Sequence, residues 1–168
     1  MSMDTYFSLL NIAPIFALDK DQLEKAWREA SSRVHPDRFA MASAAEKRIA
    51  MQWASRINQA YDVLKSPVKR AAYLCELAGF AINAESNTSM DTAFLMKQMQ
   101  WREELDQVRA DTEGLSRLLS TISTEEKVLE QCITELLDNK KDYAKASEKI
   151  RQLMFVTKVQ QEIQSLLI

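Results

Sequence analysis

The tripeptide His35-Pro36-Asp37 contains two side chains of types common in catalytic sites, an imidazole and a carboxylate. His35 is the only histidine among 168 residues. An imidazole and a carboxylate two positions apart could exchange protons with a substrate. An active site also needs a nucleophile or an oxyanion-binding backbone, and neither a neighbouring nucleophile nor a glycine-rich turn accompanies this tripeptide. We therefore expect a chain that is not an enzyme, and we keep an acid–base enzyme or metal protein as the weaker hypothesis.

The two cysteines give no metal-binding pattern. Cys75 and Cys132 lie far apart, and no Cys-x-x-Cys occurs. A closed zinc site takes four ligands, usually cysteine and histidine. We expect two reduced thiols that act as small apolar groups, no cofactor, and no stoichiometric zinc or iron in the purified protein.

Composition favours an all-α fold. Apolar residues make up 46% of the chain, enough for a packed core, while only two glycines and three prolines occur. That scarcity argues against tight hairpins and phosphate-binding glycine loops. The net charge of −2 is not typical of a nucleic-acid-binding protein. Residues 1–75 carry 11 Lys/Arg and 8 Asp/Glu, whereas residues 76–168 carry 11 and 16, so the halves are expected to offer different surfaces.

The N-terminus shows no targeting signal. Residues 1–4 contain no basic or apolar leader. No apolar run approaches the ~18 residues of a membrane span. The sequence therefore predicts a cytoplasmic protein without a membrane partner.

Helical periodicity and caps predict the elements of the first half. We expect helices over about 4–10, 19–34 and 43–65, and a fourth that begins at Pro67 with Ser66 as its cap. Asp19 and Ser43 are the expected caps of the long helices, with Gln22 and Glu46 in capping-box positions. The apolar sets predicted to face a core are Tyr6, Phe7, Leu9 and Leu10; Leu23, Trp27, Ala30 and Val34; and Ile49, Trp53, Ile57, Ala60, Tyr61 and Leu64.

Between the two long helices lies a polar loop. Pro36 excludes His35 from the helical region, and Asp37 and Arg38 follow it. Three cations, Lys25, Arg28 and Arg33, lie away from the apolar stripe of the preceding helix. They belong either to an ordinary solvated face or to a surface that binds a partner.

The second half predicts a three-helix bundle with helices at about 89–110, 115–138 and 141–167. Gly114 is expected to separate the first two and Asp138-Asn139 the last two. Short connections make successive helices antiparallel. Gly79 is the expected C′ residue of the preceding helix. The polar segment 83–89 marks the boundary, so the predicted parts are 1–78, a linker at 79–88, and a bundle at 89–168.

The first helix of this bundle carries apolar residues outside its core stripe. With Phe94 set at zero and about 100° per residue, Trp101, Leu105 and Val108 form the stripe. Leu95, Met96 and Met99 then fall on its side and back, and Phe155 on the last helix lies outside the face of Leu153, Val156 and Ile163. An apolar cluster with a polar rim is typical of a protein-binding patch. Alternatively, the third helix covers these residues.

The first half resembles a J-domain, the module by which co-chaperones stimulate ATP hydrolysis by a DnaK-class chaperone. His35-Pro36-Asp37 stands between two helices, and Ala60-Tyr61, Leu64, Pro67, Arg70 and Tyr73 follow at the J-domain spacing. The resemblance implies that the chaperone binds a surface made of Lys25, Arg28, Arg33, His35, Pro36, Asp37 and Arg38.

The whole chain resembles the HscB family of iron–sulphur-cluster co-chaperones, on residues 91–96 and 102–106 after the Tyr73-Leu74…Gly79-Phe80 step. The resemblance implies an HscA-like chaperone and an IscU-like scaffold protein as partners. The scaffold contacts that it implies are Leu95, Met96, Met99, Gln100, Glu103, Gln107 and Phe155. Family members often have acids where Gln100 and Gln107 stand. The family's N-terminal cysteine-rich metal module, present in some relatives, has no counterpart here.

Two non-enzymatic alternatives stay open beside this hypothesis. One is a general J-domain co-chaperone whose bundle binds another client, and the other is a purely structural helical protein. An ATPase-stimulation assay with purified chaperone distinguishes these possibilities from one another and from the enzyme.

Overall fold

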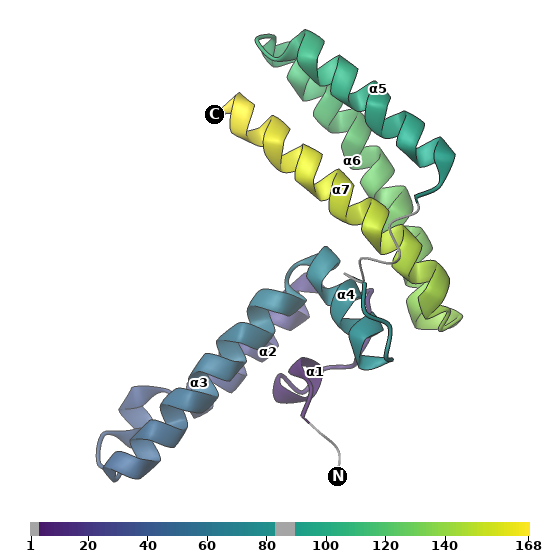
Figure 1. Ribbon diagram of the computed structural model, residues 1–168. Helices are drawn as coiled ribbons and strands as arrows, with labels where there is room; N and C mark the ends of the chain where they lie inside the picture. The colour runs from purple at the N-terminus through teal and green to yellow at the C-terminus, as the bar shows by residue number, and fades with distance from the viewer. Residues whose placement is uncertain (1–3, 83–89) are drawn as a thin grey trace. The chain divides into compact units, whose positions relative to one another are not determined.

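The computed structural model describes residues 4–82 and 90–168, and within these ranges it is all-α, as predicted (Figure 1). The helices are α1 (Tyr6–Leu9), α2 (Lys20–Arg33), the 3₁₀ turn η1 (Pro36–Phe39), α3 (Ala44–Leu64), α4 (Pro67–Leu77), α5 (Thr92–Val108), α6 (Thr112–Thr134), the π turn η3 (Glu135–Asn139) and α7 (Tyr143–Leu167). They form two compact units, one extending to Leu74 and the other beginning at Cys75, so the division lies within α4.

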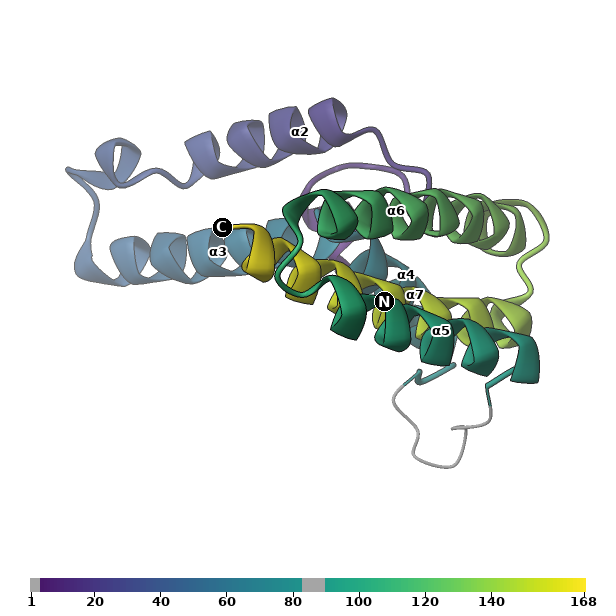
Figure 2. The ribbon, with the colours of Figure 1, turned by 90° about the horizontal axis from the view of Figure 1, so that it is seen from above.

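The first unit is built on the antiparallel pair of α2 and α3, which Figure 2 shows as two long rods joined at one end through η1. Both predicted caps are confirmed. The Asp19 carboxylate accepts a hydrogen bond from the Asp21 amide at 2.9 Å, and the Ser43 hydroxyl accepts one from the Glu46 amide at 3.2 Å. Each bond satisfies an amide that the first helical turn leaves without a partner.

The core of this unit lies between α1, α2 and α3. Its buried members are Phe7, Leu10, Leu23, Ala30, Ile57, Ala60 and Leu64. Trp27 on α2 stacks on Tyr61 of α3 with ring centroids 4.5 Å apart, and its indole nitrogen donates to Asn58 at 3.0 Å. The predicted apolar stripes of α1 and α2 are therefore confirmed.

On α3 the prediction is wrong for two residues near the N-terminal end of the helix. Ile49 is 52% exposed, and the neighbouring Ala50 is buried in its place. Trp53 is only half-buried, with the guanidinium of Arg56 5.1 Å from its ring. One residue turns a helix by about 100°, so the stripe read from periodicity was displaced by one position where α3 faces η1.

Arg70 and Tyr73 on α4 belong to the sequence pattern that resembles a J-domain, and both form hydrogen bonds with other parts of the first unit. The buried Arg70 donates to the carbonyls of Phe16 at 2.8 Å and Leu64 at 2.7 Å. The Tyr73 hydroxyl accepts from the Tyr6 amide at 3.0 Å. A buried cation is costly unless it is hydrogen-bonded, and these bonds secure the end of α3 and the start of α1 at once.

Helix α4 ends at Leu77, and Gly79 is its C′ residue, as predicted. This residue has a φ of +88°, a conformation that favours glycine. The amide of Phe80 donates to the Cys75 carbonyl at 2.8 Å and that of Gly79 to the Glu76 carbonyl at 3.0 Å. This pair of bonds is the Schellman motif. The predicted polar segment 83–89 lies outside the described residues.

The second unit is the expected three-helix bundle of α5, α6 and α7, which run alongside one another in Figures 1 and 2. Its fully buried side chains include Leu105, Leu115, Ile122, Ile133, Ile150, Leu153, Val156, Val159 and Ile163. Each such aliphatic side chain contributes about 1.5–3 kcal/mol through removal from water. The apolar faces predicted for α5 and α7 are confirmed.

Gly114 does not separate two helices; it lies buried in the first turn of α6. The turn is made instead by residues 109–111. A Cβ at Gly114 would lie 2.6 Å from Cγ1 and 2.8 Å from Cβ of Val108. The glycine therefore serves close packing of α6 against the end of α5.

The connection from α6 to α7 also differs from the prediction, because Asp138 and Asn139 lie within the π turn η3 and the break falls at residues 140–142. Lys141 takes the left-handed conformation, with φ of +55°. The Asp142 amide donates to the Leu136 carbonyl at 2.8 Å, and its carboxylate accepts from the Lys145 amide at 3.1 Å as the cap of α7.

Candidate functional site

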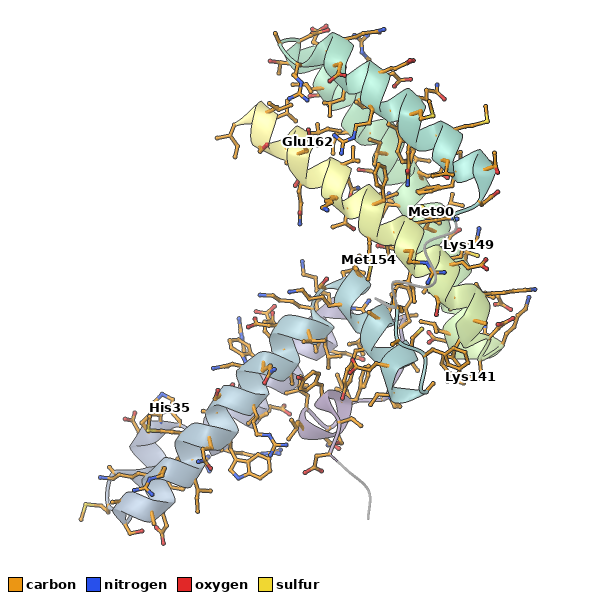
Figure 3. The ribbon with its side chains drawn as sticks, in the orientation of Figure 1. His35, Met90, Lys141, Lys149, Met154 and Glu162 are labelled. Atoms are coloured by element: carbon orange, nitrogen blue, oxygen red, sulfur yellow. The ribbon has the colours of Figure 1, made fainter. Side chains whose placement is uncertain are left out.

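The first candidate surface is the end of the α2–α3 pair, where Figure 3 labels His35. His35, Pro36, Asp37 and Arg38 are all exposed, and the side chain of Asp37 is 93% accessible. They are held in the 3₁₀ turn η1 rather than in an irregular loop. Pro36 occupies its first position, where a missing amide proton costs nothing. We call these four residues the tip.

The imidazole of His35 helps to form this turn. Its Nδ1 accepts a hydrogen bond from the Asp37 amide at 3.2 Å, and the Arg38 amide donates to the His35 carbonyl at 3.0 Å. A ring nitrogen that accepts carries no proton, so the proton of the neutral ring is on Nε2. The 3.6 Å approach of Asp37 Oδ2 to Nδ1 is then no ion pair. The tip presents the Asp37 carboxylate, the Nε2–H donor of His35 and the guanidinium of Arg38.

An apolar hollow adjoins the tip. It has a volume of about 370 Å³ and is lined by residues that include Pro36, Phe39, Ala50 and Met51, with Lys47 as its one cation. Met51 is 71% exposed. Neither Phe39 nor Met51 was among the residues predicted to bind a partner, because neither falls on a helical stripe that the core uses.

The three cations on α2 are exposed, as expected, but they are not equivalent. Arg28 forms an ion pair with Glu24 at 2.5 Å, one turn away. Lys25 and Arg33 form no ion pair within the described part of the chain. Arg33 lies in the last turn of α2, next to the tip. Of these three cations, Lys25 and Arg33 are therefore the two that no carboxylate in the described part of the chain pairs with.

The second candidate surface is on α5. Leu95, Met96 and Met99 are 43%, 66% and 69% exposed, and residues three and four apart are neighbours on a helix. Three polar residues, Gln100, Glu103 and Gln107, are exposed on the same helix. We call these six residues the α5 face; its apolar part is solvent-facing, as the helical wheel predicted.

Phe155 corrects one detail of this prediction. Its ring is half-buried rather than solvent-facing, because it packs edge-on against the buried Phe94 at 6.1 Å and 86°. With Met99 and Glu103 of the α5 face, Phe155 lines a hollow of about 330 Å³. The α5 hollow, as we call it, thus joins α5 to α7.

Gln98 and Arg102 complete the lining of the α5 hollow, and neither was singled out from the sequence. Gln107 lies elsewhere, in a separate hollow toward α6 that also contains Gly114 and Arg117. Gln100 donates to Glu104 at 3.2 Å. Of the predicted scaffold contacts, Met99, Glu103 and Phe155 therefore line the α5 hollow, and the other four do not.

Comparison with known proteins gives the family. A family model for the DnaJ domain matches residues 5–73, and a model described as the HSCB C-terminal oligomerisation domain matches residues 90–164. The co-chaperone protein HscB homolog of Bordetella pertussis is 50% identical over 163 residues, which cover 97% of this chain and 96% of the relative. The chain belongs to the HscB co-chaperone family.

Solved structures agree with this membership. The chaperone HscB from Vibrio cholerae is 32% identical, covers 96% of both chains and superposes with a TM-score of 0.82. Human co-chaperone HscB, at 24% identity, supports the fold alone; it covers 98% of this chain and 83% of its own, with a TM-score of 0.89. The recognition made from the sequence is confirmed.

Each of the two family models covers the range that contains one of the two candidate surfaces of this HscB-family chain. The tip and the α2 cations lie in the range of the DnaJ model, and the α5 face and Phe155 lie in the range of the C-terminal model. The individual residues named for each surface stay predictions, because similarity over a range does not assign a role to one side chain.

Outside these surfaces, the thiol of Cys75 has a shifted pKa. Cys75 is buried, which raises the pKa of its thiol above the ordinary value, and a contact from the Ser147 hydroxyl at 4.0 Å opposes that shift. Cys132 is half-buried. No group of three or more His, Cys, Asp or Glu side chains that could hold a metal occurs in residues 4–82 and 90–168. In the same ranges no helix is long and apolar enough to cross a membrane.

Proposed function

We propose that this protein stimulates the ATPase of a DnaK-class, HscA-like chaperone and delivers an IscU-like iron–sulphur scaffold protein to it. In this proposal residues 1–78 are the J-domain, 79–88 the linker and 89–168 the scaffold-binding bundle. The observation that carries the proposal is the pair of exposed surfaces within one HscB-family chain: a charged tip in the DnaJ range and an apolar α5 face in the C-terminal range.

At the tip the chain would contribute a fixed charge rather than chemistry. Asp37 is almost fully accessible, and the turn that begins at Pro36 sets its direction. Lys25 and Arg33 would steer an acidic chaperone surface toward it. Attraction between exposed charges weakens beyond a Debye length of about 8 Å at physiological salt, so this contribution should decline as salt rises.

On the bundle, the apolar part of the α5 face would hold the scaffold. Burial of the exposed Leu95, Met96 and Met99 against a partner's apolar surface would be favourable, and a few such anchors dominate most interfaces. The rim is less acidic than in much of the family because Gln100 and Gln107 carry no charge. We therefore infer that scaffold recognition here depends more on apolar contact and less on charge.

The chain itself would catalyse nothing. ATP hydrolysis belongs to the chaperone, and the cluster is cargo carried by the scaffold, so the co-chaperone needs no cofactor. Its relatives are named as co-chaperones rather than enzymes, which supports this view. A cytoplasmic location remains a prediction from the sequence.

The experiment measures the ATPase rate of a purified HscA-like chaperone with this protein, with the IscU-like scaffold, and with both together. We expect this protein alone to raise the basal rate, and the two together to raise it more than the sum of their separate effects. Stimulation without any scaffold dependence would indicate a general J-domain co-chaperone with another client. Absence of stimulation would contradict the proposal.

A further inference from the structure

Arg102 on α5 contacts two residues of α7 that lie seven positions apart. Its Nη1 lies 2.6 Å from Glu162 Oε2, and its guanidinium carbon lies 5.9 Å from the centre of the Phe155 ring. Glu162 also lies 3.5 Å from Arg109. Figure 3 labels Glu162 on the part of α7 that runs beside α5. The carboxylate thus fixes the direction in which Arg102 extends.

One side of the Phe155 ring is held by the core. Its edge-on contact with the buried Phe94 fixes that side. The other side meets Arg102 and the α5 hollow of about 330 Å³, which Arg102 and Phe155 line together. A ring beside an empty hollow can turn into it and fill it. The guanidinium over the ring opposes that rotation, because a cation is attracted to an aromatic face within about 6 Å of its centre.

We propose that Arg102 is a positioning residue for scaffold binding: tied to Glu162, it keeps the Phe155 ring upright as a wall of the α5 hollow. The hollow then stays open to receive an apolar side chain of the scaffold. This inference rests on the proposed function, since it concerns how the bundle presents a surface that the scaffold would bind. Arg102 acts in it by positioning Phe155, and the inference assigns it no ion pair or hydrogen bond with the partner.

The bundle provides a matched control for the loss of an ion pair. Lys97 Nζ lies 2.6 Å from Glu125 Oε1 and joins α5 to α6. The side chains of Lys97 and Glu125 are 47% and 27% exposed, against 45% and 32% for Arg102 and Glu162. Ion pairs this exposed contribute little to folding. The two pairs therefore match in exposure, whereas only Arg102 lies over Phe155 and only Glu162 also contacts a second cation, Arg109.

The experiment measures scaffold affinity of the full-length protein by calorimetry, for wild type, Arg102→Ala, Phe155→Ala, the double variant and Lys97→Ala. We expect Arg102→Ala to weaken binding at least about fivefold, the threshold of an important interface residue, and Lys97→Ala to bind as wild type. The double variant should bind no more weakly than Phe155→Ala alone, because Arg102 acts through that ring.

Two results of this cycle would overturn the inference while leaving scaffold binding intact. One is wild-type affinity in Arg102→Ala. The other is additive losses in the double variant, which would mean that Arg102 contacts the scaffold directly. A wild-type chain that does not bind the scaffold would overturn the proposed function itself.

A charge-exchange variant distinguishes the effect of the ion pair between α5 and α7 from the effect of the cation over the Phe155 ring. Arg102→Glu combined with Glu162→Arg restores an ion pair between α5 and α7 but places no cation over Phe155. The exchange also removes the contact of Glu162 with Arg109. Because exposed pairs contribute little to folding, we expect this variant to melt close to wild type and to bind as weakly as Arg102→Ala. Recovery of wild-type affinity would show that the tie alone suffices, and the positioning of the ring would then be rejected.

Discussion

The imidazole Nδ1 of His35 accepts a hydrogen bond from the backbone amide of Asp37, at 3.2 Å. This bond closes a turn around Pro36, so the orientation of the Asp37 carboxylate depends on the ring two residues earlier. The histidine is therefore both part of the exposed surface and the cap of the turn that displays it.

His35→Gln tests this double role. Glutamine can offer an amide oxygen to the Asp37 amide but on a longer, more flexible chain, so we expect chaperone ATPase stimulation to fall by at least tenfold. The residue is exposed, and surface changes usually alter stability by no more than about 0.5 kcal/mol, so helicity and melting temperature should stay near wild type. A steady-state ATPase assay and a thermal melt measure both. Undiminished stimulation would remove the basis for assigning the tip to chaperone binding.

Replacing Leu95, Met96 and Met99 together with alanine tests the α5 face. These side chains are exposed and alanine favours helix, so we expect stability within about 1 kcal/mol of wild type and scaffold affinity reduced at least tenfold. Basal ATPase stimulation should be unchanged. Leu105→Ala is the contrasting variant; its fully buried side chain should cost about 2–5 kcal/mol. A triple variant as unstable as Leu105→Ala would mean that the α5 face belongs to the core.

Phe155 is kept out of that triple variant because it is half-buried against Phe94. Its replacement should lower the melting temperature as well as scaffold affinity, since part of the ring leaves a void. Affinity changes in Phe155→Ala are therefore to be compared at a temperature where the variant is fully folded.

Gly114→Ala should destabilise the bundle although alanine is the better helix former. The gain in helix propensity is about 1 kcal/mol, but the new Cβ would meet the Val108 Cβ at 2.8 Å, and overpacking costs about 1–3 kcal/mol. Chemical denaturation measures the net loss. Val108→Ala in the same chain should restore part of it, and Ser116→Ala, at an exposed position two residues further along α6, should be neutral. An alanine at 114 that stabilises the protein would show that α5 and α6 can separate there without cost.

The Cys75 thiol predicts a pH dependence. Burial raises its pKa, so the folded state holds the thiol proton more tightly than the unfolded state. Its contribution to stability is then complete below the unfolded-state pKa and is lost as pH rises through the folded-state pKa. The melting temperature of wild type should fall relative to Cys75→Ala as pH rises above about 8.5. In the folded protein at pH 8, a thiol reagent should modify the half-buried Cys132 before Cys75; the reverse order would contradict the buried thiol.

The sequence determined most of the local structure, because its signals act over a few residues. Caps at Asp19 and Ser43, the glycine at the end of α4, and the core faces of α1, α2, α5 and α7 all follow from side chains within one or two turns. The family could also be recognised from the sequence, since His35-Pro36-Asp37 and the later Tyr61, Arg70 and Tyr73 stand at the spacing of a J-domain.

Only the tertiary structure decided which side chains are covered. Ile49 and Ala50 are adjacent, and which of them is buried depends on where η1 meets α3. Gly114 looked like a helix break, yet it is a contact point with Val108. Phe155 and Arg102 are far apart in the sequence, and helical periodicity says nothing about a ring on α7 lying beneath a guanidinium on α5. Periodicity gives the direction of a side chain from its own helix, whereas burial depends on what the neighbouring helix places there.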